Sequence, residues 1–124
     1  MQDAQLPSIS DDGSVDGTAL QRTFNRWIEL GERRGVPFGT EPCNYQRYME
    51  EVGFVDIHVE VMKWPTGPWM EEERMKQIGL WWRTNQIQGW EAVQRAGKFP
   101  GGDVEMEAVR KDVMNPDVHS YIKL

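Results

Sequence analysis

The chain has one cysteine, few basic residues relative to its acidic ones, and no long apolar run. With Cys43 alone no intramolecular disulfide can form, and with only two histidines there is no set of residues for a zinc site. The net charge of -6 provides no basic face, which argues against binding to nucleic acid or to an anionic membrane. No segment has the length of a membrane span, and no basic-then-apolar signal opens the chain. We therefore expect a cytoplasmic protein, with the nucleus as the alternative, that binds neither nucleic acid nor membrane.

Several motifs that bind cofactors or activate nucleophiles are also lacking. Neither Gly101-Gly102 nor Gly13/Gly17 is expected to follow a strand and open a helix, as a phosphate-binding loop requires. No serine lies in a nucleophile elbow, and Cys43 has no basic activator nearby in sequence. Glu71–Glu73 suit the solvated start of a helix better than a metal or acid/base cluster. We therefore predict no metal ligands and no cofactor-binding residues.

What the sequence does contain predicts an α+β, mainly helical fold. The 124 residues are enough for one domain with a core. Helical spacing of apolar residues predicts about four helices, over 16–34, 45–52, 71–96 and 103–114. We place the N-cap of the first helix at Ser14 or Asp16, and that of the last at Asp103. Gly79 and Gly89 weaken the third helix, so we expect a kink or a closely packed neighbour at either.

One segment alternates strictly between apolar and polar residues. One face carries Val55, Ile57, Val59 and Val61, and the other carries Asp56, His58 and Glu60. This pattern predicts a half-exposed edge strand at about 54–62, and 118–124 reads as a partial antiparallel strand. A single strand cannot satisfy its own backbone groups, so it needs partners that this sequence hardly supplies. Because the chain opens in a loop (1–15) and closes inside a strand, we expect 1–124 to be a single partial domain.

The two histidines are the natural acid/base candidates. His119 opens the terminal strand directly after a helix stop, a position where site residues are common, and we take it as the candidate catalytic residue. An ordinary exposed role is the alternative for His119. For His58, on the polar face of the predicted strand, that exposed role is the favoured interpretation.

The six tryptophans are the most unusual feature of the composition. Adjacent Trp81 and Trp82 diverge by about 100° on a helix, so they cannot both face one core. Packing in the core or against a missing part of the protein is one explanation. The other is a pocket for a flat aromatic or apolar small molecule. The candidate substrate-binding residues are then Trp64, Trp69, Trp81, Trp82, Asn85 and Gln86.

Five stretches in a fixed order resemble one protein family. They are residues 1–14 (MQDAQLPSISDDGS), Trp27, residues 45–69, residues 76–89 (KQIGLWWRTNQIQG) and residues 105–121 (EMEAVRKDVMNPDVHSY). Together they resemble the fungal class I S-adenosylmethionine-dependent methyltransferases, which include LaeA-like regulators and secondary-metabolite methyltransferases. The resemblance implies the C-terminal, acceptor-side portion of a Rossmann-like fold. It makes 54–62 the sixth strand and HSYIKL the start of the seventh, antiparallel strand.

The same resemblance implies what this chain does not contain. The family builds its cofactor site from its first four strands, and none of these corresponds to a segment here. No cofactor is therefore expected in this chain alone, and S-adenosylmethionine only if the missing half is supplied. The family's run near residues 98–102 is more helical than KFPGG, so the pocket differs there too.

Three functional hypotheses follow. The first is the acceptor-substrate half of a small-molecule methyltransferase that cannot methylate alone. It would act mainly by placing the acceptor in line with the sulfonium. The second is a non-catalytic interaction module whose strand edge pairs with a protein partner or a second copy of the chain. The third is a cofactor-free enzyme or binder of a small-molecule substrate, derived from a methyltransferase fold.

Overall fold

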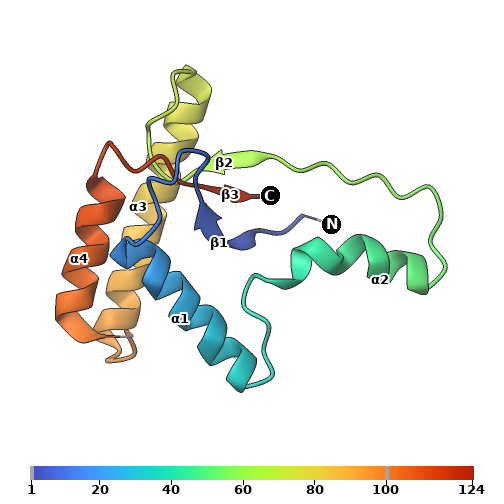
Figure 1. Ribbon diagram of the computed structural model, residues 1–124, viewed down its shortest axis with the longest axis horizontal. Coiled ribbons are helices and arrows are strands. Elements are labelled where there is room, and N and C mark those ends of the chain that lie inside the picture. Colours follow the sequence, from blue (N-terminus) through green and yellow to red (C-terminus); the bar gives the residue numbers. More distant parts are fainter. Residues whose placement is uncertain (1, 100) are drawn as a thin grey trace.

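A computed structural model describes residues 2–99 and 101–124, in which short strands are separated by groups of helices (Figure 1). Their order is β1 (Gln5–Ile9), α1 (Ala19–Arg33), η1 (Glu41–Asn44), α2 (Tyr45–Glu51), β2 (Lys63–Pro65), α3 (Glu73–Arg95), α4 (Gly102–Met114) and β3 (Tyr121–Lys123). The predicted α+β class with four α-helices is confirmed. None of the described helices is both long and apolar enough to cross a membrane.

The three strands form one antiparallel sheet in the order β1-β3-β2. The predicted terminal strand is thus the central one, and its Ile122, fully buried, pairs with Trp64. Two sequence-based expectations need correction. The edge strand lies at Lys63–Pro65 rather than 54–62, and the predicted N-terminal loop contains β1.

The alternating segment is unpaired for a physical reason, and its backbone is not extended throughout, because Asp56 has a φ of 57°. The pairing between β2 and β3 ends at Met62, which exchanges two hydrogen bonds of 3.0 Å with Leu124. Residues 55–61 make no backbone hydrogen bond within the described part of the chain. The alternation of apolar and polar residues therefore did not locate a strand here. A strand needs a neighbouring strand for its hydrogen bonds, and the sequence pattern does not show which segment that is.

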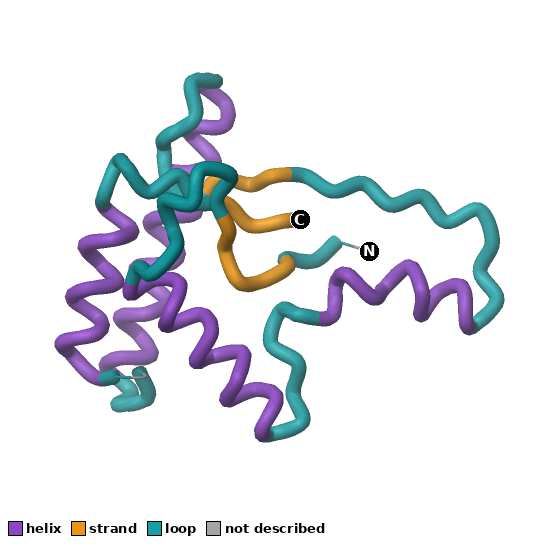
Figure 2. The backbone as a smooth tube through the Cα atoms, in the orientation of Figure 1, coloured by secondary structure: helices purple, strands orange, loops and turns teal. Residues whose placement is uncertain are grey.

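The core lies where α1, α3 and α4 pack together beside the sheet, as Figures 1 and 2 show. Phe24 of α1 meets Trp90 of α3 edge to face at 5.5 Å between ring centroids. Phe99 meets the same indole at 6.3 Å. The buried residues that complete this core are Val15, Ala19, Leu20, Met106, Val109, Val113 and Val118. The three helices thus form one body, and α2 contacts only η1 among the elements.

The helix starts differ from those predicted. Thr18 caps α1, with its hydroxyl accepting from the Gln21 amide at 3.1 Å, so neither Ser14 nor Asp16 has that role. The cap of α4 is Gly101 at φ 87°, and Asp103 instead accepts from the Gln94 side chain. Ser14 instead contacts the His119 amide and the Asp12 carboxylate.

Gly79 and Gly89 provide a matched pair within α3. A Cβ at Gly79 would collide with the Gly67 backbone carbonyl, whereas nothing lies within 4 Å of the same position at Gly89. We expect Gly79→Ala to destabilise the fold by about 1–3 kcal/mol through overpacking. Gly89→Ala should stabilise it by up to about 1 kcal/mol through helix propensity. Urea unfolding of the two variants tests this prediction. A change in the free energy of unfolding of the same sign in both variants would contradict it.

Candidate functional site

His119 and Asp12 form a hydrogen-bonded pair where the loop after β1 meets the residues before β3. The imidazole Nδ1 lies 2.7 Å from Asp12 Oδ2. Ser14 organises both partners, because its hydroxyl accepts from the His119 amide at 2.8 Å and its own amide donates to Asp12 Oδ1 at 2.9 Å. The sequence singled out His119, but its partner is 107 residues away.

The electrostatics of this pair fix the chemistry of the ring. Hydrogen bonds from the Ser14 hydroxyl and amide, with a smaller effect of His119, lower the pKa of Asp12 to about 2. Asp12 is therefore a carboxylate at neutral pH, and a carboxylate can only accept. Nδ1 must then carry the hydrogen, which leaves the lone pair of a neutral imidazole on Nε2. The His119 side chain is 42% exposed, so the ring is open to a small molecule.

Trp69 lies beside the imidazole. Its indole is 5.3 Å from the His119 ring, centroid to centroid, with 31° between the planes. The indole Nε1 donates to the Ser120 carbonyl at 2.9 Å, and the Thr66 hydroxyl donates to the same oxygen at 3.0 Å. The loop after β2 is thus tied to the backbone next to His119, which places Trp69 as a flat apolar wall of this site.

A second network anchors the loop that carries Asp12. Asp11 accepts from the Tyr121 hydroxyl at 2.7 Å and pairs with Lys63 Nζ at 2.5 Å. The Lys63 ammonium also sits 4.6 Å above the Tyr121 ring. Lys63 lowers the pKa of Asp11, while Asp11 raises the pKa of Lys63 and of Tyr121. Asp11 and Lys63 carry opposite charges at neutral pH, so the network links the loop to β2 and β3.

Sequence reasoning missed Asp11, Asp12, Ser14 and Lys63 as members of this site. The only signal in the sequence was the Ser-Asp-Asp-Gly-Ser run within residues 10–14, which belongs to a stretch that carries the family resemblance. That run gave no indication of its partners, because the contacts depend on β1 and β3 being neighbours in the sheet.

The other predicted substrate-binding residues are divided between two places. Trp64, Trp81, Trp82 and Asn85 line one shallow pocket of about 430 Å³ with Ile78. The Trp64 and Trp82 rings are 6.4 Å apart, and Trp81 is 75% exposed. Gln86 is instead buried, and its side-chain amide makes no hydrogen bond within the described residues. The structure therefore assembles an aromatic surface from four of the six predicted residues, with Trp69 at the His119 site.

The described residues hold no cluster of three or more His, Cys, Asp or Glu side chains suited to a metal. Contrary to the sequence-based expectation, Gly13 and Gly17 do lie between a strand and a helix, β1 and α1. However, Asp112 already accepts from the Leu20 amide at 3.0 Å, and Thr18 caps Gln21. With these two donors occupied and two carboxylates, Asp11 and Asp12, in the loop, this turn is unfavourable for an anionic cofactor group.

The chain is similar to part of several fungal proteins. It is 32% identical to "Probable methyltransferase tdiE" of Emericella nidulans, over 98% of this chain and 40% of that protein. It is 26% identical to "Secondary metabolism regulator laeA" of Monascus pilosus and 21% identical to "Protein-methionine methyltransferase laeA" of Emericella nidulans. Each of these two matches covers 90% of the chain and 32% of the relative. The chain thus spans about a third to two fifths of the length of these relatives.

No protein-family model matches the chain, and no solved structure matches it either. The homologues nevertheless confirm the predicted resemblance to fungal methyltransferases.

Proposed function

We propose that this chain, whose homologues are fungal methyltransferases, forms the acceptor-side part of a small-molecule methyltransferase and does not methylate alone. The observation that carries the proposal is the His119–Asp12 pair beside Trp69, which combines a proton acceptor with a flat apolar wall. The donor, S-adenosylmethionine, would supply the methyl group from a site outside the segment described here.

The pair is suited to removing a proton from the acceptor. A hydroxyl or amine loses a proton when it is methylated, and His119 Nε2 has the lone pair to take it. Asp12 holds the ring in this tautomer and stabilises the imidazolium that forms. Because Ser14 binds both partners, the orientation of the ring is fixed by the backbone as well as by the carboxylate.

The aromatic surface suits the binding of the acceptor. Trp64 lies on β2 and Trp69 in the loop directly after it, so one short segment carries walls of both places. The indole N–H groups of Trp64 and Trp82 have no protein acceptor among the described residues, although they are shielded from water. A flat aromatic molecule would pack on the ring faces of this surface.

Calorimetry with S-adenosylmethionine tests whether cofactor binding needs residues outside this chain. We expect no binding to this chain alone, because Asp112 and Thr18 already occupy two amide donors at the start of α1, and Asp11 and Asp12 lie in the same turn. Binding should be present when the chain replaces its matching region in the full-length tdiE protein. A micromolar affinity of the isolated chain would contradict the proposal, as would a chimera that folds but binds no cofactor.

A further inference from the structure

A small pocket lies between the loop after β2, the middle of α3 and the end of α4. It is here called the Arg83 pocket, and it is lined by residues 66–69, Arg83, residues 112–116, Val118 and Ser120. All of these residues lie between β2 and β3 in the sequence. This part of the chain therefore forms the pocket by itself.

A close contact between two glycines positions Arg83. A Cβ at Gly79 would lie 2.1 Å from the Gly67 carbonyl oxygen, so the loop packs directly on α3 only because residue 79 is glycine. Arg83 follows Gly79 by one helical turn and lies on the same face of the helix. The backbone contact thus sets the half-buried Arg83 side chain against the loop.

Trp69 and Ser120 connect the Arg83 pocket to the His119 site. Both residues line the pocket, and the Trp69 indole is 5.3 Å from the His119 ring, centroid to centroid. Ser120 directly follows His119, and its carbonyl accepts from the Trp69 indole at 2.9 Å. The pocket and the His119–Asp12 pair therefore share one wall.

The polar groups of the pocket include two sets of donors without a protein acceptor. Arg83 takes part in none of the ion pairs within the described part of the chain. The Asn115 side chain accepts from the Asp117 amide through Oδ1 at 3.0 Å, which leaves its NH₂ group as a donor. The hydroxyls of Thr66 and Ser120 are instead hydrogen-bonded to each other. A ligand that accepts hydrogen bonds would complement Arg83 and Asn115.

Asp112 is the one acidic residue of the lining, and its charge is already compensated. Its Oδ2 accepts from the Leu20 amide at 3.0 Å, in the first turn of α1. The dipole of a helix favours a negative charge at this end. Arg83 is therefore the charge of the pocket that lacks a counterpart.

The size of the pocket limits which group can enter. Its volume is about 70 Å³, about half of the roughly 150 Å³ cavity in which a benzene ring binds. An aromatic ring is therefore too large and would remain outside, beside Trp69. A carboxylate is small enough, and it accepts two parallel N–H bonds from a guanidinium.

We propose that the Arg83 pocket binds the carboxylate of an aromatic acid, and that such acids are the acceptors of this site. The carboxylate accepts from Arg83 and from the Asn115 amide, while the ring lies against Trp69 on the side of His119. The role of the acid as methyl acceptor rests on the proposed function. Its binding does not, because it can be measured without cofactor.

Calorimetry on this chain compares para-hydroxybenzoate with para-hydroxybenzamide, which replaces the carboxylate by a neutral amide of the same shape. The acid should bind at least about tenfold more tightly, because charge-assisted hydrogen bonds are about twice as strong as neutral ones. Equal affinities for the two molecules, or no saturable binding of the acid, would overturn the proposal.

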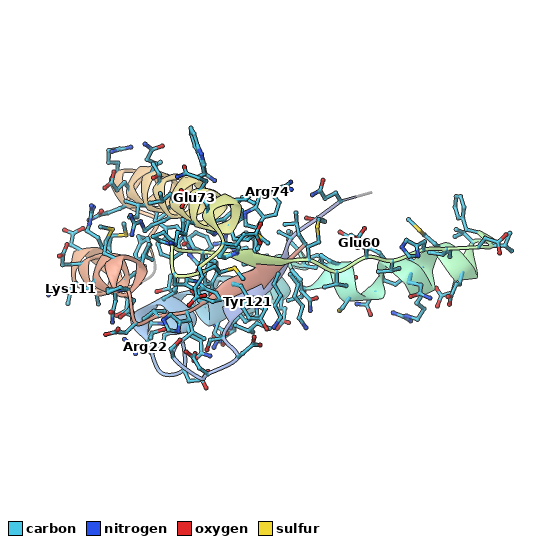
Figure 3. All side chains as sticks on the ribbon, turned by 90° about the horizontal axis from the view of Figure 1, so that it is seen from above. Arg22, Glu60, Glu73, Arg74, Lys111 and Tyr121 are labelled. Carbon is cyan, nitrogen blue, oxygen red and sulfur yellow. The ribbon has the colours of Figure 1, made fainter. Side chains whose placement is uncertain are left out.

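Substitutions in α3 separate the pocket from general attraction of an anion. Arg83→Met keeps an apolar stem but removes the guanidinium, so the acid should then bind no more tightly than the amide. Arg83→Lys keeps the charge but not the planar fork, and should retain part of the preference. Arg74, labelled on α3 in Figure 3, does not line the pocket. Arg74→Met should therefore change the affinity for the acid less than about twofold, and a loss equal to that of Arg83→Met would overturn the proposal.

Asn115→Asp tests the second donor. The aspartate can still accept from the Asp117 amide, but a carboxylate oxygen replaces the NH₂ group that faces the ligand. The acid should bind at least about tenfold more weakly to this variant, and the amide should lose much less. Equal losses for the two molecules would exclude Asn115 from carboxylate binding and overturn this part of the proposal.

Methylation assays on the tdiE chimera distinguish this proposal from the proposed function. Equal kcat/KM for aromatic acids and for their neutral amides would overturn the carboxylate pocket and leave the methyltransferase role intact. A chimera that binds the cofactor and the acid but methylates no acceptor would overturn the proposed function, while the carboxylate pocket would stand.

Discussion

Trp90→Ala is expected to lower the free energy of unfolding by about 3–5 kcal/mol, the range for removing a large buried aromatic side chain. Trp90 is 9% exposed and contacts Phe24 and Phe99 edge to face, so its removal leaves a cavity between α1, α3 and the loop before α4. Domains of this size are stable by only about 5–15 kcal/mol. The variant should therefore have lost a large fraction of its stability in a urea titration.

Trp81→Ala is the matched control, because it makes the same change in the same helix. Trp81 is 75% exposed, and surface substitutions usually change stability by less than about 0.5 kcal/mol. A similar loss for both variants would show that Trp81 is covered in solution, by a second copy or by another face of the chain. Light scattering at high concentration would distinguish these two cases.

The helices could be predicted from the sequence because their signals are local. Leu20, Phe24 and Trp27 repeat at helical spacing, and α1 spans most of the predicted range. Strand pairing is not local. The alternation of Val55 to Val61 did not show where a ladder forms, because only contact with β3 decides this, and that contact starts at Met62.

In the candidate site, too, residues with a local sequence signal could be predicted and those placed by strand pairing could not. His119 could be selected from its position after a helix stop, and Trp69 from its place in a Trp/Pro/Gly loop. Asp12 could not be selected, because its approach to His119 depends on β1 pairing with β3 across more than a hundred residues. The tryptophans could not be sorted into core, pocket and site by composition, since Trp81, Trp82 and Trp90 share one helix and differ only in what packs on each face.

His119→Ala is expected to reduce kcat/KM for methyl transfer by about 100-fold to 10,000-fold, the usual contribution of a positioned base. The assay uses the chimera in which this chain replaces the matching region of tdiE, with an acceptor found by quenching of tryptophan fluorescence. The side chain is 42% exposed, so the unfolding midpoint should change little. A loss of less than tenfold with an intact fold would exclude His119 as the base.

Asp12 provides the sharper version of this test. In Asp12→Asn the amide nitrogen can donate to Nδ1, which would place the imidazole hydrogen on Nε2 and remove the lone pair needed to accept a proton. Asp12→Ala removes the partner without imposing the wrong tautomer, so it should cost less activity than the isosteric Asn variant. If the alanine variant were instead the more damaged one, Asp12 would act by holding the loop with Ser14 rather than by orienting the ring. If the pair accepts a proton, Asp12→Asn should therefore lose more activity than Asp12→Ala, although asparagine is the smaller chemical change.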